Sequence, residues 1–65
     1  GMPPMQYLMQ WRTSLAATRL RDSKDSILRV ANAVGYESEA AFNRAFKKEF
    51  GLPPATWRRR ELGKR

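Results

Sequence analysis

The residues best suited to binding a polyanion lie at positions 38–48, in the run Ser-Glu-Ala-Ala-Phe-Asn-Arg-Ala-Phe-Lys-Lys. Phe42 and Phe46 are four residues apart, so a helix through this run would turn both rings toward a core. At about 100° per residue, the opposite side of that helix carries Ala40, Asn43, Arg44 and Lys47. These side chains include a guanidinium, an amide and an ammonium group, which can donate to base edges and phosphates. The run therefore predicts a helix that reads a DNA groove.

The candidates for base contact on this helix differ in what they can read. Arg44 carries a planar fork that can pair with guanine O6 and N7, a contact worth roughly 1 to 3 kcal/mol in discrimination. Asn43 can pair with adenine through its amide, whereas Ala40 and Ala41 offer only a methyl-sized contact to thymine. Glu39 could accept from the cytosine amino group, but an acid in the first helical turn also complements the helix dipole, and we favour that second role.

Three further residues of this segment could contact DNA phosphates. Ser38 stands where a helix N-cap belongs, and the amides behind it could also receive a phosphate. Lys47 and Lys48 could reach phosphates at the groove edge. Most charges on small helical domains only form a solvated face, and these lysines would also favour the C-terminal half of the helix through its dipole. We expect one lysine rather than both to contact phosphate.

A helix-turn-helix over residues 26–50 would present these side chains. Asp25 or Ser26 can cap its first helix, and Gly35 supplies the left-handed residue that ends it. The apolar face of this helix follows i, i+3, i+4, i+7 spacing and consists of Ile27, Val30, Ala31 and Val34. The second helix runs from about Glu39 to Phe50 and ends at Gly51.

Two more helices are predicted on either side of this unit. The first spans residues 3–21 after a proline pair, and its apolar residues Leu8, Trp11 and Leu15 follow i, i+3, i+7 spacing, which places them toward the core. Arg12 is predicted to pack its stem against the core and form a salt bridge. A short closing helix over residues 53–60 carries Trp57, and residues 61–65 form a disordered tail. The fold class is all-α, a homeodomain-like helix-turn-helix of three main helices and a short C-terminal helix in one domain over residues 1–65.

The amino-acid composition favours nucleic-acid binding over metal binding and catalysis. The chain has 65 residues, a formal charge of +7 and a pI near 10.9, which favours polyanionic partners such as nucleic acid. It has no cysteine and no histidine, so we predict no metal site, no cofactor and no catalytic residues. The acidic pairs Asp22 with Asp25 and Glu37 with Glu39 lack a basic partner set, and we predict that the protein is not an enzyme. Without a long apolar run, we expect a cytoplasmic protein with no membrane partner.

The order of motifs resembles the AraC/XylS family of bacterial transcription regulators. The residues that carry the resemblance are Ile27, Ala31, Gly35-Tyr36, Ser38, Phe42-Asn43-Arg44-Ala45-Phe46-Lys47-Lys48, Gly51, Pro54 and Trp57-Arg58. Pro3 and Pro53 stand where the family often has a serine or threonine cap, and Trp57 replaces a more usual tyrosine or phenylalanine. Despite these departures, the resemblance covers nearly the whole chain.

The resemblance implies an architecture and a set of partners. Family members carry two helix-turn-helix units joined by a long linker helix, so residues 3–21 look like that linker and the first unit is absent from this chain. An effector-binding and dimerisation domain is expected in the full-length protein. The implied function is sequence-specific binding of double-stranded promoter DNA, with transcription activation and RNA polymerase as a further partner.

A short internal repeat is consistent with such a duplicated unit. Residues 1–7 match residues 51–57, with glycine, an apolar residue, two prolines and an aromatic in the same places. If the later copy follows a helix-turn-helix, the earlier copy would follow another one. The alternative is that Gly1 is a cloning remnant and that the proline pairs only start helices.

Other function classes remain open at this stage. The chain could be a protein-interaction module, for example one that contacts RNA polymerase, with only non-specific DNA affinity. The first helix, with Trp11 and its arginines, could bind a membrane surface. The aromatic residues could stack on single-stranded nucleic acid, although core packing accounts better for Trp11, Phe42, Phe46 and Trp57.

Overall fold

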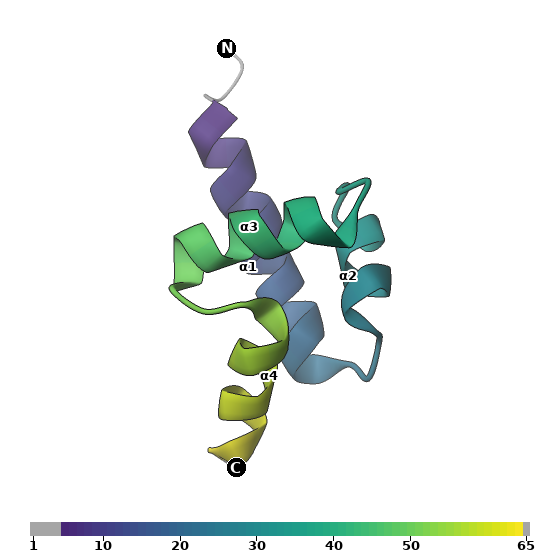
Figure 1. The fold of residues 1–65 in the computed structure, drawn as a ribbon, viewed down its shortest axis with the longest axis vertical. Coiled ribbons are helices and arrows are strands. Elements are labelled where there is room, and N and C mark those ends of the chain that lie inside the picture. The colour runs from purple at the N-terminus through teal and green to yellow at the C-terminus, as the bar shows by residue number, and fades with distance from the viewer. Residues whose placement is uncertain (1–4, 65) are drawn as a thin grey trace.

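The computed structural model describes the backbone of residues 5–64 and the side chains of residue 8 and residues 10–64. This part of the protein consists of four helices joined by short loops. They are α1 (Met5–Asp22), α2 (Ile27–Ala33), α3 (Glu39–Phe50) and α4 (Pro54–Gly63), and Figure 1 shows their arrangement. No strand occurs within residues 5–64. The all-α, homeodomain-like helix-turn-helix fold is confirmed, with α2 and α3 as its two helices.

Local capping chemistry sets the ends of the two helix-turn-helix helices. Ser26 accepts a hydrogen bond from the Arg29 amide at 3.1 Å, so the N-cap of α2 is Ser26 rather than Asp25. Ser38 accepts from the Ala41 amide at 3.1 Å and caps α3 in the same way. Gly51 ends α3 with a φ of 79°, in the left-handed region that glycine adopts without a Cβ penalty. These capping interactions fix the residues at which α3 begins and ends.

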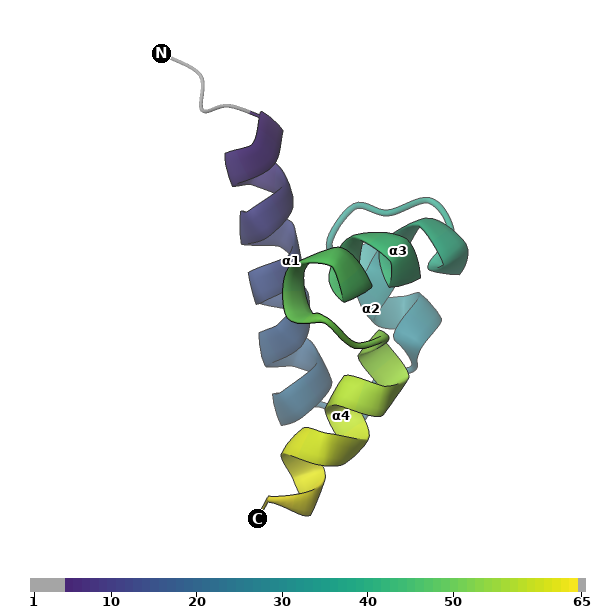
Figure 2. The same ribbon diagram turned by 60° about the vertical axis from the view of Figure 1, so that its left-hand side comes forward.

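Helix α1 forms the long support on which the other helices pack. In Figures 1 and 2, α3 and α4 both lie on one side of α1, and α2 stands beside α3. The core between the helices is small and is made by apolar side chains of α1, α2 and α3. Its buried members are Ala16, Ala17, Leu20, Val30, Ala31, Val34, Phe42 and Phe46, with Ile27, Tyr36, Phe50 and Trp57 packed against them.

The core-facing side of α1 differs from the predicted one. Trp11 is 58% exposed and Leu15 is 37% exposed, so the prediction that the Leu8, Trp11 and Leu15 stripe faces the core is wrong for these two residues, while Leu8 is half-buried. The stripe exists on the helix, but α1 packs through the side that carries Thr13, Ala16, Ala17 and Leu20. Small residues in this face let α1 approach the phenylalanine rings of α3 closely. Spacing identified an apolar face but not the one that the core uses.

A pair of substitutions in α1 tests this orientation. Leu20→Ala removes a fully buried side chain and should lower the free energy of unfolding by about 2 to 5 kcal/mol. Trp11→Ala removes a larger but exposed side chain and should change it by less than about 1 kcal/mol. Urea unfolding followed by far-ultraviolet circular dichroism measures both. A loss for Trp11→Ala as large as that for Leu20→Ala would contradict the observed packing of α1.

Helix α4 is longer than predicted. It extends to Gly63, so the expectation of a closing helix that ends at residue 60 and a disordered tail from residue 61 is wrong for residues 61–63. At the end of α4, Lys64 forms a 3.0 Å ion pair with Glu61 one turn earlier, which favours the longer helix. At its start, Trp57 packs on the rings of Phe46 and Phe50 and so attaches α4 to α3. Residues 1–4 and 65 lie outside the described residues. The predicted start of the first helix at residues 3 and 4 and the first four residues of the internal repeat are therefore not described.

Candidate nucleic-acid interface

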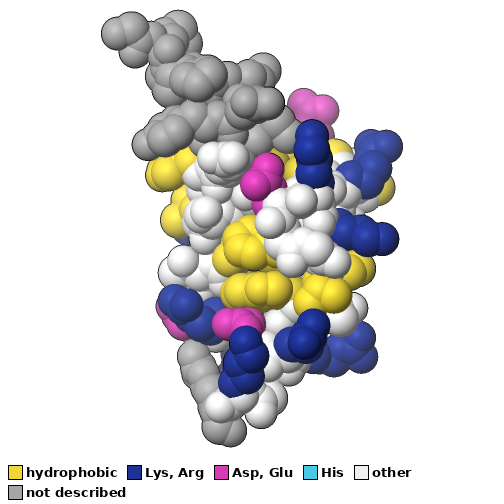
Figure 3. All heavy atoms as spheres, turned by 90° about the vertical axis from the view of Figure 1, so that its left-hand side faces the viewer, with side chains coloured by type: hydrophobic (Ala, Val, Ile, Leu, Met, Phe, Trp, Pro, Cys, Tyr) yellow, Lys and Arg dark blue, Asp and Glu magenta, His cyan; other side chains and the backbone are white. Residues whose placement is uncertain are grey.

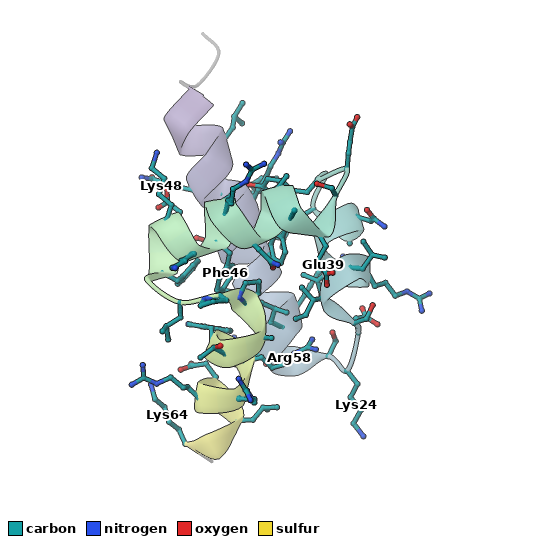
Figure 4. The ribbon with its side chains drawn as sticks, viewed as in Figure 1. Lys24, Glu39, Phe46, Lys48, Arg58 and Lys64 are labelled. Atoms are coloured by element: carbon teal, nitrogen blue, oxygen red, sulfur yellow. The ribbon has the colours of Figure 1, made fainter. Side chains whose placement is uncertain are left out.

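Helix α3 has one buried face and one exposed polar face. Phe42 and Phe46 are fully buried and Ala45 nearly so, and Figure 4 shows Phe46 directed from α3 into the body of the protein. Phe42 and Phe46 also pack on each other, with ring centroids 5.7 Å apart. This packing fixes the rotation of α3 about its own axis. The side turned outward is therefore defined by the core, as the sequence pattern predicted.

Only some of the predicted base-contacting residues lie on the outward face of α3. Ala40, Arg44 and Lys47 are exposed, whereas Asn43 is half-buried at the edge of that face. Glu39 is exposed too, but helical geometry turns it about 140° away from Arg44. The geometry therefore groups Ala40, Arg44 and Lys47 and leaves Glu39 outside the group.

The predicted phosphate-contacting residues lie at the two ends of α3. Ser38 is exposed at the N-terminal end, where its hydroxyl already accepts the Ala41 amide as a cap. Lys48 is exposed near the C-terminal end of the helix, as Figure 4 shows, beside Lys47.

The turn before α3 is held against α1 by an arginine and an aromatic ring. Tyr36 packs on Phe42 with ring centroids 5.5 Å apart, and the guanidinium carbon of Arg12 lies 6.0 Å from the centroid of the Tyr36 ring. Within residues 5–64 Arg12 has no carboxylate at salt-bridge distance, so the predicted salt bridge is wrong and the contact is a weak cation–π interaction. Arg12 thus couples the turn to α1.

A row of positively charged side chains lies on the side of the protein away from α1. Figure 3 is turned so that α1 lies toward the left and α3 and α4 toward the right, and Lys and Arg side chains follow that right-hand edge. Within the described part of the chain, Arg44, Lys47 and Lys48 form no ion pair. Arg21 on α1 instead donates to Asp22 at 3.0 Å, and this hydrogen bond raises the pKa of its guanidinium. The uncompensated cations of α3 are thus available to an anionic ligand.

Arg58 has a structural contact that the sequence did not reveal. Its Nε donates to the Leu20 carbonyl oxygen at 2.8 Å, and a terminal guanidinium nitrogen donates to the Ser23 carbonyl oxygen at 3.5 Å. The first of these carbonyls is in the last turn of α1, where a cation is favourable and backbone acceptors lack helical partners. Arg58 therefore ties α4 to α1. Its partners are 38 and 35 residues away in sequence, so no local signal could have identified them.

We also searched the described residues for a metal site, a pocket and a membrane-spanning helix. They contain no group of three or more acidic, histidine or cysteine side chains that could hold a metal ion. A shallow open hollow lies between the end of α3 and α4, lined by Phe50, Leu52, Trp57, Arg60, Glu61 and Lys64. None of the helices in this part of the chain has the length and apolar character that crossing a membrane requires. The outward face of α3 is the strongest candidate interface.

Both a protein family and individual known proteins match most of the chain. The family described as "Helix-turn-helix domain" matches residues 1–60. An AraC-like transcription regulator of Streptomyces lividans is 42% identical over 59 residues, which is 91% of this chain and 19% of that protein. The transcriptional regulator AlkR of Acinetobacter baylyi is 46% identical over 55 residues, which is 85% of this chain and 18% of AlkR.

A shorter relative is matched over a larger share of its length. The regulatory protein SoxS of Salmonella typhimurium is 38% identical over 55 residues, which is 85% of this chain and 51% of SoxS. The chain thus spans about a fifth of the length of the first two relatives and about half of SoxS. No solved structure matched the chain.

Proposed function

Because the chain belongs to the AraC-type helix-turn-helix family of transcription regulators, we propose that it binds double-stranded DNA in a sequence-specific manner, with α3 in the major groove. The observation that carries this proposal is the exposed, uncompensated basic face of α3, held in place by the buried Phe42 and Phe46. An α-helix fits the width of the major groove, and the second helix of a helix-turn-helix is the one that enters it.

The residues take different roles in this proposal. Arg44 is the principal base-reading residue, since it is exposed near the middle of the outward face and can pair with guanine through two hydrogen bonds. Asn43 reads adenine from the edge of the face, and Ala40 contacts a thymine methyl group. Glu39 has the weakest case for base contact, because it lies on another side of α3 and complements the helix dipole.

Phosphate contacts would fix the helix in the groove without reading sequence. We assign them to Ser38 at one end of α3 and to one of the two lysines, Lys47 or Lys48, at the other. A few such contacts should dominate the affinity of this small domain, so its binding should be weak and strongly dependent on salt.

The role of the full-length protein follows from the same proposal. We infer that the rest of the protein holds a first helix-turn-helix and an effector-binding and dimerisation domain, and that the whole binds promoter DNA in a bacterial cytoplasm and activates transcription by contacting RNA polymerase. The exposed Trp11 and Leu15 side chains of α1 support a neighbouring unit, because adjacent exposed apolar side chains can pack against another protein surface.

A second candidate function rests on that same apolar surface of α1. Trp11 and Leu15 could bind a separate protein partner, in which case the fragment would have only non-specific affinity for DNA. The two functions differ in a measurable way. A DNA reader discriminates among duplexes through α3, whereas a protein-interaction module binds all duplexes alike.

The experiment that tests the proposal compares two lysine variants in titrations against duplex DNA. Fluorescence anisotropy of a labelled random-sequence duplex and of a labelled selected duplex is followed at several salt concentrations for the parent chain, Lys47→Ala and Lys24→Ala. Lys24 is the matched control, because it is exposed in the loop between α1 and α2, away from α3 in Figure 4. Each variant removes one positive charge.

If Lys47 contacts a phosphate, Lys47→Ala makes the negative slope of log K against log salt less steep by about 0.9 and weakens binding to every duplex by the same factor. Lys24→Ala should leave the slope at the parent value. Equal slopes for the two variants would show that Lys47 acts only through net charge. Absence of binding by the parent at low salt would exclude DNA binding by this chain.

A further inference from the structure

Helix α4 carries a second group of cations that the helix-turn-helix unit does not include. Its sequence contains Arg58, Arg59 and Arg60 in succession. Arg58 is half-buried and donates to the backbone of α1, as described above, but Arg59 and Arg60 are exposed. The three arginines therefore have different environments, and only the last two can reach a ligand.

The contacts of α4 fix the directions of these two arginines. Arg58 points toward α1, and Trp57 packs against Phe46 and Phe50 of α3. At about 100° per residue, Arg60 follows Arg58 by about 200°, so it faces away from α1. Arg59 lies about 160° from Trp57 and faces away from α3. Arg60 thus lies within about 20° of the direction opposite α1, and Arg59 lies about 80° from that direction, on the side of α4 away from α3.

The surface of α4 that is opposite α1 adjoins the outward face of α3. The helices α3 and α4 lie on the same side of α1 in both ribbon views (Figures 1 and 2), and only three residues, 51–53, connect them. Figure 3 shows Lys and Arg side chains continuing along the edge away from α1. Within residues 5–64, neither Arg59 nor Arg60 forms an ion pair, because Glu61 pairs with Lys64 and Asp22 pairs with Arg21.

We propose that α4 is a second DNA-contacting element, in which Arg59 and Arg60 bind phosphates of the duplex whose groove receives α3. This inference rests on the proposed function and extends its interface by one helix. Guanidinium groups suit this role because they can give two parallel hydrogen bonds to one phosphate. Phosphate contacts of this kind position a protein on DNA but carry no base information. Arg58, by tying α4 to α1, sets the orientation from which the next two arginines reach out.

The test compares two double variants with equal loss of charge. Arg59→Ala/Arg60→Ala removes the proposed contacts, and Arg19→Ala/Arg21→Ala removes two exposed arginines from α1, the helix behind α3 and α4 in Figure 1. The parent chain and both variants are titrated by fluorescence anisotropy with a random-sequence duplex and with a duplex selected from a random pool by the parent. Several salt concentrations are used, and circular dichroism verifies that each variant is folded.

The proposal predicts that the α4 variant makes the negative slope of log K against log salt less steep by about 1 to 2, since each lost phosphate contact removes about 0.9. Its preference for the selected duplex should equal that of the parent, and the α1 variant should keep the parent slope. Equal slopes for the two double variants would overturn the proposal, while DNA binding by the parent would stand. Failure of the parent to bind any duplex would overturn the proposed function and this inference together.

Discussion

Phe46→Ala is expected to lower the free energy of unfolding by about 3 to 5 kcal/mol and the unfolding temperature by more than about 10 °C. Phe46 is fully buried and its ring contacts Phe42, Phe50 and Trp57, with centroid distances of 5.7, 4.4 and 5.5 Å. Truncating a buried phenylalanine typically costs about 3 to 5 kcal/mol. A domain of this length has only about 3 to 10 kcal/mol of stability, so the loss is a large part of the total.

Thermal unfolding by far-ultraviolet circular dichroism measures this effect. Lys47→Ala provides the control within the same helix, because Lys47 is adjacent in sequence but exposed, and it should unfold within a few degrees of the parent. DNA binding by Phe46→Ala should fall together with its helical signal. A Phe46→Ala protein that unfolds at the parent temperature would show that this ring cluster does not hold α3 in place.

Arg44→Ala is expected to remove most of the discrimination between DNA sequences. If Arg44 pairs with a guanine, its loss costs about 1 to 3 kcal/mol for duplexes that contain that base pair, which is a factor of about 5 to 150 in affinity. Arg44 is exposed on α3, so the substitution should leave the fold intact. The measurement is the ratio of dissociation constants for a selected and a random-sequence duplex at one salt concentration.

Arg44→Lys is the matched variant for this experiment. It keeps the positive charge but loses the planar fork, so it should retain non-specific affinity and lose much of the preference for the selected duplex. If Arg44→Ala and the parent give the same ratio of dissociation constants, base reading by Arg44 is excluded. In that case the selectivity would have to come from Asn43, Ala40 or the shape of the duplex.

The helix-turn-helix itself could be predicted from the sequence because its signals are local. The caps Ser26 and Ser38, the left-handed Gly51 and the i, i+4 phenylalanine pair of α3 each depend on residues within one or two helical turns. The outward direction of Arg44 follows from the buried positions of Phe42 and Phe46. The DNA contacts assigned to these residues remain predictions.

The parts that could not be predicted depend on contacts between distant segments. An apolar stripe at Leu8, Trp11 and Leu15 satisfied helical spacing, but the core uses the alanine-rich side of α1 because that side fits against the large rings of α3. Similarly, the position of α4 depends on Trp57 packing against α3, and the role of Arg58 depends on carbonyl groups near the end of α1. Local periodicity contains no information on which of two faces another helix will cover.

The central claim, that DNA binds the outward face of α3, is tested most directly by nuclear magnetic resonance mapping. Two-dimensional ¹H–¹⁵N spectra of the labelled chain are recorded during titration with an unlabelled selected duplex at low salt. We expect the largest shift changes at the amides of Ala40, Asn43, Arg44 and Lys47 and little change at the Trp11 indole. Large changes at Trp11 and Leu15 with an unperturbed α3 would contradict the claim and favour the protein-interaction function of α1.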